Sequence, residues 1–334
     1  MTRKEIQSRL QETAGELLRS GRVDLFIGHA KASLPLRCRP LVISRAEEAG
    51  ELVWNSFCQN NLSVYLPGLF SGSIPIEREG DPESPLRIGL AVKPCDARSV
   101  RMLVQERQVD RERVVLVGLG CTGMIDRRKA LAVLEGKEAL GAGEDDSGDI
   151  HVVLEDGTET TLARDAVLAD ACLECALEGA GDCDLTIGQM TPPEGRGGPR
   201  ADVESMTLEE RWKRFSDGVS ECIRCYACRQ VCPLCYCKDC FADRTSPRWL
   251  GIGNCGSDLE GFHLIRAFHM AGRCTDCGAC VAACPMGIDT RWLTRWLNRD
   301  AELIFGYRAG LSFDGKPLLC EFSMEDPQEF LTEP

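Results

Sequence analysis

The sequence predicts two domains of different class: an N-terminal α/β domain with a parallel βαβ sheet core, and a cysteine-rich C-terminal α+β domain. Three observations predict this division. Within residues 86–120 an apolar strand, a helix and a second apolar strand follow one another, as in a βαβ unit with buried parallel strands. Residues 191–202, TPPEGRGGPRAD, have the composition of a linker. Cysteines are dense beyond it, so we expect domains at 1–195 and 205–334.

The elements of the first domain are predicted in chain order from periodicity and turn signals. Thr2 and Glu5 are spaced as a capping box at the start of an amphipathic helix. Asp156-Gly157 is a typical hairpin turn. The predicted elements are a helix at 3–19, a strand at 40–44, a helix at 45–57, a strand at 86–93, a helix at 96–108, a strand at 113–120, a flexible acidic loop at 141–149 and a hairpin at 150–163.

Composition limits the classes of partner. The formal charge of −13 argues against nucleic acid and anionic membrane surfaces, and aromatic residues make up only 6% of the 334 residues. The N-terminal residues lack a secretory h-region, and no apolar run reaches the length of a membrane span, so we expect a cytoplasmic protein without membrane insertion. In a reducing compartment, 20 cysteines indicate metal or redox chemistry rather than disulfides.

Two copies of the pattern C-x2-C-x2-C-x3-C-P carry the strongest signal. This is the bacterial ferredoxin pattern for two 4Fe-4S clusters, in which the fourth cysteine of each run binds the other cluster. Two zinc ribbons are the alternative, which complete runs with a trailing proline make less favourable. The predicted ligand sets are Cys222, Cys225, Cys228 and Cys284 for one cluster, and Cys232, Cys274, Cys277 and Cys280 for the other.

The two runs are separated by an insertion at 233–273. It holds four more cysteines, Cys235, Cys237, Cys240 and Cys255. They could bind an additional iron–sulfur or zinc centre, or be small buried side chains beside the clusters.

Further cysteines belong to the first domain. Cys95 and Cys121 follow the two strands of the βαβ unit, at the sheet edge where α/β proteins bind ligands. Cys121, Cys172 and Cys175, with either Cys95 or Cys183, would complete a third 4Fe-4S site. Glycines at 118, 120 and 123 spell GxGxxG, but a cysteine inside the loop and the missing acidic strand end argue against a dinucleotide site.

The stretches VKPCDARSV, VGLGCTG and CLEC…CDLTIG resemble the beta subunits of coenzyme F-420-reducing (deazaflavin) hydrogenases and formate dehydrogenases. LVWNSFCQNNLSVYLP, at 52–67, is similar to a bacterial branch that also carries a two-cluster ferredoxin domain. The resemblance implies FAD and a 4Fe-4S cluster held by Cys95, Cys121, Cys172 and Cys175, with the flavin near Lys93, Asp96, Asn60 and Asn61. The chain has no clear counterpart of the family's glycine-rich flavin segment.

These features together predict an iron–sulfur, and by resemblance flavin-containing, electron-transfer subunit of an oxidoreductase complex in anaerobic metabolism. The expected partners are formate dehydrogenase, hydrogenase or heterodisulfide-reductase-like subunits. One alternative is a stand-alone FAD- and Fe-S-dependent oxidoreductase acting on a small substrate. Another is a non-catalytic assembly or metal-storage protein. A helix over 291–305 carries Trp292, Leu293, Trp296 and Leu297, which could dock a partner or pack on its own domain.

Overall fold

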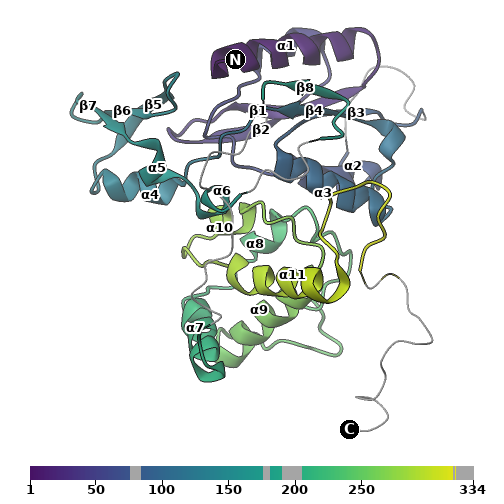
Figure 1. The fold of residues 1–334 in the computed structure, drawn as a ribbon, viewed down its shortest axis with the longest axis vertical. Coiled ribbons are helices and arrows are strands. Elements are labelled where there is room, and N and C mark those ends of the chain that lie inside the picture. Colours follow the sequence, from purple (N-terminus) through teal and green to yellow (C-terminus); the bar gives the residue numbers. More distant parts are fainter. Residues whose placement is uncertain (76–83, 176–180, 190–204, 319, 321–334) are drawn as a thin grey trace.

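The computed structural model describes residues 1–75, 84–175, 181–189, 205–318 and 320. Figure 1 shows a sheet-containing part above and a helical part below, with α6 and α10 at the junction between them. The predicted linker at 191–202 lies outside the described residues. No helix in the described ranges combines the length and apolar character that a membrane span needs.

A five-stranded sheet organises the upper part, in the order β2-β1-β3-β4-β8. Strand β1 pairs antiparallel with β2, whereas the pairs β1–β3, β3–β4 and β4–β8 are parallel. The sheet is therefore mixed but mostly parallel. Its strands are β1 (Leu25–Lys31), β2 (Cys38–Ile43), β3 (Ile88–Val92), β4 (Val114–Leu119) and β8 (Leu185–Ile187).

Helices cover both faces of this sheet, which explains why every residue of β3 is buried. Helix α1 (Arg3–Arg19) packs on one face and begins at the predicted capping box of Thr2 and Glu5. Helix α3 (Pro94–Gln105) connects β3 to β4 and packs on the other face, beside α2 (Leu66–Phe70). The two hydrophobic core clusters lie accordingly, one under α1 and one under α3.

A small antiparallel sheet extends from the upper part as an arm (Figure 1). It contains β5 (Ala139–Glu144), β6 (Ile150–Leu154) and β7 (Glu159–Leu162), and it adjoins α4 (Arg127–Val133) and α5 (Arg164–Val167). The β6–β7 hairpin confirms the predicted turn at Asp156-Gly157. Residues 141–144 belong to β5, so the prediction of a loop over all of 141–149 was wrong.

The lower part is helical. Its helices are α7 (Leu208–Ser220), α8 (Ala227–Gln230), α9 (Gly256–Met270), α10 (Ala279–Ala283) and α11 (Arg291–Phe305), and α6 (Asp170–Leu173) lies above them. Residues 205–318 contain no strand, which differs from the expected α+β class. Between the two cysteine runs, residues 256–270 form α9 and the residues before it form turns and irregular structure.

Two further expectations are corrected in the first domain. Residues 45–57 contain only a 3-10 helix at Ala46–Glu51, followed by a loop in which Asn55 caps the backbone of Phe57. Strand β1 has no counterpart among the predicted elements, although LFIGHAK is apolar and nearly fully buried. Two more 3-10 helices lie at Leu62–Tyr65 and Arg111–Arg113.

Candidate metal centres

The two ferredoxin-like runs fold into loops of the same backbone geometry. In the first, Arg224 and Tyr226 have φ of 51° and 58°; in the second, Asp276 and Gly278, at the equivalent positions, have φ of 56° and 74°. Non-glycine residues rarely adopt this left-handed conformation, and they persist only where surrounding structure or function demands it. Each loop then enters a short helix, α8 or α10, and these two helices pack together. The sequence repeat is thus also a structural repeat.

The cysteines gather in the crossed sets that the spacing predicts. Burial raises the pKa of Cys222, and the charges of Cys284 and Cys225 raise it further. Burial also raises the pKa of Cys228, to about 11; Arg266 opposes this shift, and Cys280 of the second set contributes to it ahead of Cys222 and Cys284, so the two sets lie close together. The fourth cysteine of the second run therefore faces the first loop.

The second set is assembled in the same way. Burial places the pKa of Cys274 well above its usual value, and the charges of Cys280, Cys232 and Cys277 add to this shift. All four thiols line one cavity of about 420 Å³ below the first domain. Cys232, the last cysteine of the first run, is thus brought to the second loop.

Backbone N–H groups point at the sulfurs of both sets and of Cys172, a cysteine of the third group described below, as they do around protein-bound iron–sulfur clusters, where such hydrogen bonds help to set the potential. Each of the four contacts comes from a residue close to a cysteine in sequence or space. The donors are Arg224 N to Cys222 Sγ at 3.4 Å, Asp276 N to Cys274 Sγ at 3.4 Å, Ile288 N to Cys284 Sγ at 3.4 Å and Met124 N to Cys172 Sγ at 3.2 Å.

A third group of cysteines lines a cavity at the carboxyl ends of β3 and β4. The cavity is partly open to solvent, and its cysteines are Cys95, Cys121, Cys172, Cys175 and Cys277. Burial raises the pKa of Cys172 to about 12, with Cys121 and Cys175 adding to the shift. Cys183 lies elsewhere, beside Arg101 and Asp184. The geometry therefore brings Cys95, rather than Cys183, to this group.

Cys277 lines the wall between the second and third groups, since it belongs to both cavities. The adjacent Gly278 lies so close to α6 that an added Cβ would be 2.6 Å from the Cβ of Ala171. Polar contacts also cross this junction: Ser99 Oγ lies 2.9 Å from Thr275 Oγ1, and Arg128 Nη2 donates to Val281 O. The two parts of the chain are held in direct contact where the cysteine groups meet.

The residues implied for the flavin are hydrogen-bonded within the protein. Lys93 Nζ lies 2.8 Å from Asp96 Oδ2 and donates to Asn60 O at 2.7 Å, and both charged side chains are buried. Asn61 Nδ2 donates to Ser99 Oγ at 3.0 Å, and Ser99 Oγ in turn contacts Thr275 of the second loop. Because protein groups already satisfy these polar atoms, the arrangement does not support a flavin-binding role for them.

The cysteines of the insertion are only partly brought together. Cys235, Cys237 and Cys240 line one groove, and the fourth cysteine in that groove is Cys320. Cys255 is exposed instead, and its thiol donates to Asp258 Oδ2 at 3.1 Å. The predicted set with Cys255 as its fourth member does not converge in the structure.

A buried cation beside the two ferredoxin-like sets tests whether they fit iron–sulfur clusters. In the described parts of the chain, no three or more His, Cys, Asp or Glu side chains converge as a mononuclear metal site requires. Arg266, 6% exposed and facing Cys280, Cys235, Cys232 and Cys228, is a buried cation whose Nε has no hydrogen-bond partner. A negatively charged cluster fits such a site.

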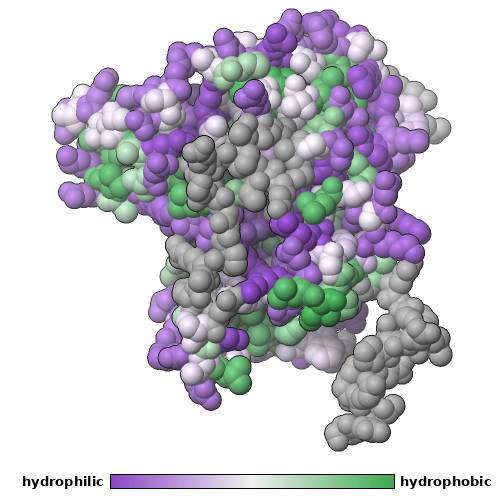
Figure 2. Space-filling view, in the orientation of Figure 1, coloured by the Kyte–Doolittle hydropathy of each residue, from purple (hydrophilic) through white to green (hydrophobic). Residues whose placement is uncertain are grey.

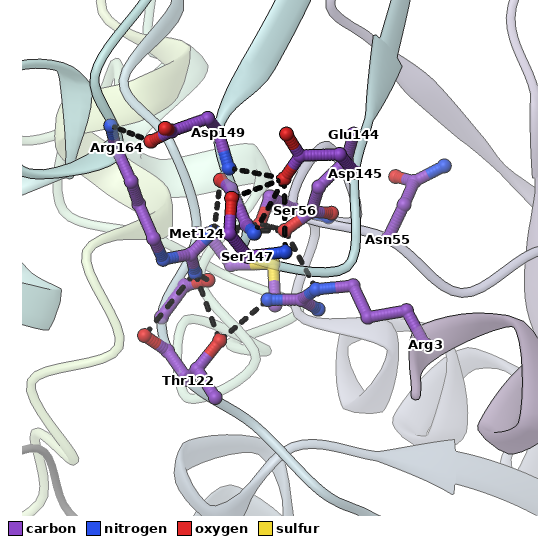
Figure 3. Close-up of polar contacts among 12 residues, drawn as sticks. Arg3, Asn55, Ser56, Thr122, Met124, Glu144, Asp145, Ser147, Asp149 and Arg164 are labelled. Atoms are coloured by element: carbon purple, nitrogen blue, oxygen red, sulfur yellow. Dashed lines mark hydrogen bonds and ion pairs between the residues drawn. The ribbon is translucent and has the colours of Figure 1, made fainter. Parts of the chain in front are cut away.

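A buried ion-pair network supports the third group and was missed at the sequence level (Figure 3). Glu144, from β5, contacts Arg3 Nε at 2.6 Å and Arg164 Nη1 at 2.8 Å, with its side chain 3% exposed. Both arginines also bind Thr122, which follows Cys121. Because its members come from distant segments, no local spacing could have indicated the network.

Two family comparisons match the parts of the chain described above. Residues 86–208 match the C terminus of the beta subunit of coenzyme F420 hydrogenase/dehydrogenase, and residues 218–288 match the 4Fe-4S dicluster domain. The first match contains the third cysteine group except for Cys277. The second contains both ferredoxin-like runs.

Two curated proteins are similar over most of the chain. The F420-dependent formate dehydrogenase subunit beta of Methanocaldococcus jannaschii is 23% identical over 292 residues, covering 70% of this chain and 76% of that protein. The F420-dependent formate dehydrogenase 1 subunit beta of Methanococcus maripaludis is 23% identical over 298 residues, covering 70% and 75%.

Among solved structures, a chain of the F420-reducing [NiFe] hydrogenase complex from Methanosarcina barkeri aligns with 18% identity and a TM-score of 0.35. The alignment covers 52% of this chain and 62% of that one. Residues 86–208 are thus similar to the C-terminal region of the coenzyme F420 hydrogenase/dehydrogenase beta subunit, residues 218–288 are similar to a 4Fe-4S dicluster domain, and most of the chain is similar to F420-dependent formate dehydrogenase beta subunits.

Proposed function

We propose that this chain is an iron–sulfur electron-transfer subunit of a redox complex. It relays electrons between a formate dehydrogenase, hydrogenase or heterodisulfide-reductase-like partner and another carrier. The homologous beta subunits are named as parts of formate dehydrogenases, which supports this class of partner. Bound 4Fe-4S clusters supply one-electron transfer, while the protein sets position, burial and hydrogen bonding.

One observation carries the proposal: Cys277 lines both the cavity of the second cysteine set and the cavity of the third. Two cluster sites that share a wall are close enough for electron exchange without a diffusing carrier. The three proposed ligand sets are Cys222, Cys225, Cys228 and Cys284; Cys232, Cys274, Cys277 and Cys280; and Cys95, Cys121, Cys172 and Cys175.

Ion pairs between the chain's own residues fix the loops at this junction. Asp276 binds Arg291 at 2.5 Å, and Arg291 also reaches Glu174 beside Cys175, at 3.1 Å. These contacts join the second ferredoxin-like loop to the segment that carries Cys172 and Cys175. We assign residues 1–195, with the β3–α3–β4 unit as their core, to a beta-subunit-like domain, and 205–334, with the insertion 233–273, to the dicluster domain.

A surface for a partner subunit is offered by the end of α11. Trp292 and Leu293 pack against the protein's own helices, whereas Leu303, Ile304 and Phe305 are exposed. Figure 2 shows hydrophobic residues gathered over this helix, below a largely hydrophilic upper part. The apolar side chains suited to docking are therefore those of the last turn.

Flavin is not included in the proposed relay, because the residues implied for it are already hydrogen-bonded within the protein. A stand-alone oxidoreductase would need that site. The extra centre predicted at Cys235, Cys237, Cys240 and Cys255 is also left out of the relay, because Cys255 does not line the groove that the other three cysteines share.

Anaerobic purification with iron and sulfide quantitation tests the proposal. Three clusters predict about twelve irons per chain. Cys172→Ser and Cys274→Ser should each reduce iron by about four and remove one EPR signal, while Cys38→Ser, a buried cysteine outside all three sets, should leave both unchanged. Colourless protein, or zinc in place of iron, would refute the proposed function.

A further inference from the structure

The side chain of Arg266 lies between the two ferredoxin-like ligand sets. It comes from α9, in the insertion that separates the two cysteine runs. Its Nη2 donates to Cys228 O at 3.1 Å, in the first loop, and the same side chain lines the cavity of Cys232, Cys274, Cys277 and Cys280. One buried guanidinium therefore contacts the first site and faces the second.

No carboxylate compensates this charge within the described part of the chain. By contrast, the buried Arg291 pairs with Asp276 and Glu174. The side chain of Arg266 lines the same cavity as Cys232 and Cys280.

The other titratable neighbour adds no negative charge. His263, three residues earlier on α9, is kept neutral because burial and the charge of Arg266 lower its pKa to about 4. A buried charge without a partner costs several kcal/mol. The sulfurs that face Arg266, together with the iron they would bind, are therefore its natural counter-charge.

We propose that Arg266 sets the reduction potentials of both ferredoxin-type clusters, and that the α9 insertion serves to deliver this charge between them. The inference rests on the proposed function. Reduction adds one negative charge to a cluster, and a positive charge held nearby in a low-dielectric interior stabilises the reduced form. Because the same cation faces both sites, it favours reduction of each and offsets the repulsion between two reduced clusters.

The reduction takes up one electron per cluster and no proton at Arg266, which stays protonated throughout. The effect of the residue is therefore expected to be the same at pH 6.5 and pH 8.5. Arg266 acts through the clusters and is a positioning residue rather than a catalytic one. The third group is an internal reference, since the cations that face Cys121 and Cys172 are Lys93 and Arg3 rather than Arg266.

The test is an anaerobic redox titration, followed by EPR, of wild type and of iron-matched Arg266→Gln, Arg266→Lys and Arg244→Gln proteins. Arg244 is the control, since it lies in the same insertion in an exposed pair with Asp239. Arg266→Gln should lower the ratio of reduced to oxidised cluster at fixed potential at least tenfold for both ferredoxin-type clusters, a shift of about 59 mV. Arg266→Lys retains the charge, so the ratio of reduced to oxidised cluster should stay within about threefold of wild type for both ferredoxin-type clusters. Arg244→Gln and the third cluster should not change.

The outcomes separate the two proposals. Iron-loaded Arg266→Gln protein with unchanged potentials would overturn the role of Arg266 and leave the proposed function standing. Wild-type protein without iron would overturn both. If Arg266→Gln loses its iron, Arg266→Lys decides: a tenfold drop in the reduced ratio despite the retained charge would refute the electrostatic role.

Discussion

Replacing Gly278 by alanine tests whether the two cysteine-bearing parts of the chain meet as tightly as the structure shows. Gly278 has φ of 74°, and a Cβ placed there would lie 2.6 Å from the Cβ of Ala171. Left-handed backbone costs a non-glycine residue roughly 1–2 kcal/mol. Carbon atoms prefer separations of about 3.5–4.0 Å, so α6 must also move by about 1 Å, an overpacking that costs about 1–3 kcal/mol.

The expected loss in the free energy of unfolding is therefore about 2–5 kcal/mol, the sum of backbone strain and overpacking. Gly306→Ala is the matched control, because Gly306 has φ of 60° and no atom within 4 Å of an added Cβ. That variant should lose only the strain contribution, about 1–2 kcal/mol. Urea unfolding of anaerobic, iron-matched protein, followed by tryptophan fluorescence, measures both.

A double-mutant cycle isolates the contact between the two parts. Ala171→Gly removes the atom that the added Cβ would strike, so the double variant should recover about 1–3 kcal/mol of the overpacking while keeping the strain. If Gly278→Ala costs no more than Gly306→Ala, or if the cycle shows no coupling, α6 and the second ferredoxin-like loop do not touch as described. The second and third cysteine groups would then not share a wall.

Two further predictions concern buried charges. Glu144→Gln leaves Arg3 and Arg164 without their shared carboxylate and should lower the free energy of unfolding in urea by about 3–5 kcal/mol. The control is Asp217→Asn, which breaks an exposed ion pair and should cost less than about 0.5 kcal/mol. Equally small losses in both variants would contradict the buried network. The pKa of His263 in the folded protein is lowered to about 4, so the unfolded chain binds a proton at this histidine more tightly than the folded one. The free energy of unfolding should therefore fall by about 1.4 kcal/mol between pH 7.5 and pH 5.5. His263→Gln should remove this loss, and the same dependence of stability on pH in both proteins would refute the prediction.

The cysteine pattern by itself predicted the two crossed ligand sets. In two-cluster ferredoxins, each cluster takes three ligands from one tight loop and the fourth from the other run, so local spacing is enough to predict the sets. The apolar runs at 86–93 and 113–120 likewise predicted neighbouring strands, and these are β3 and β4 in the structure. A strand that is buried on both faces of a sheet has apolar residues at successive positions rather than alternating polar and apolar ones, so the run itself indicates the strand. The capping box of α1 is equally local.

Only the tertiary structure decided which distant residues meet. In the structure, Cys95 lies with the third cysteine group and Cys183 does not. Cys320, rather than Cys255, lines the groove of Cys235. Gly278 lies next to Ala171. The tertiary structure also placed the buried side chain of Arg266 between the two ferredoxin-like loops. Such contacts join segments far apart in sequence, and they arise from packing of complete elements rather than from any spacing that a sequence displays.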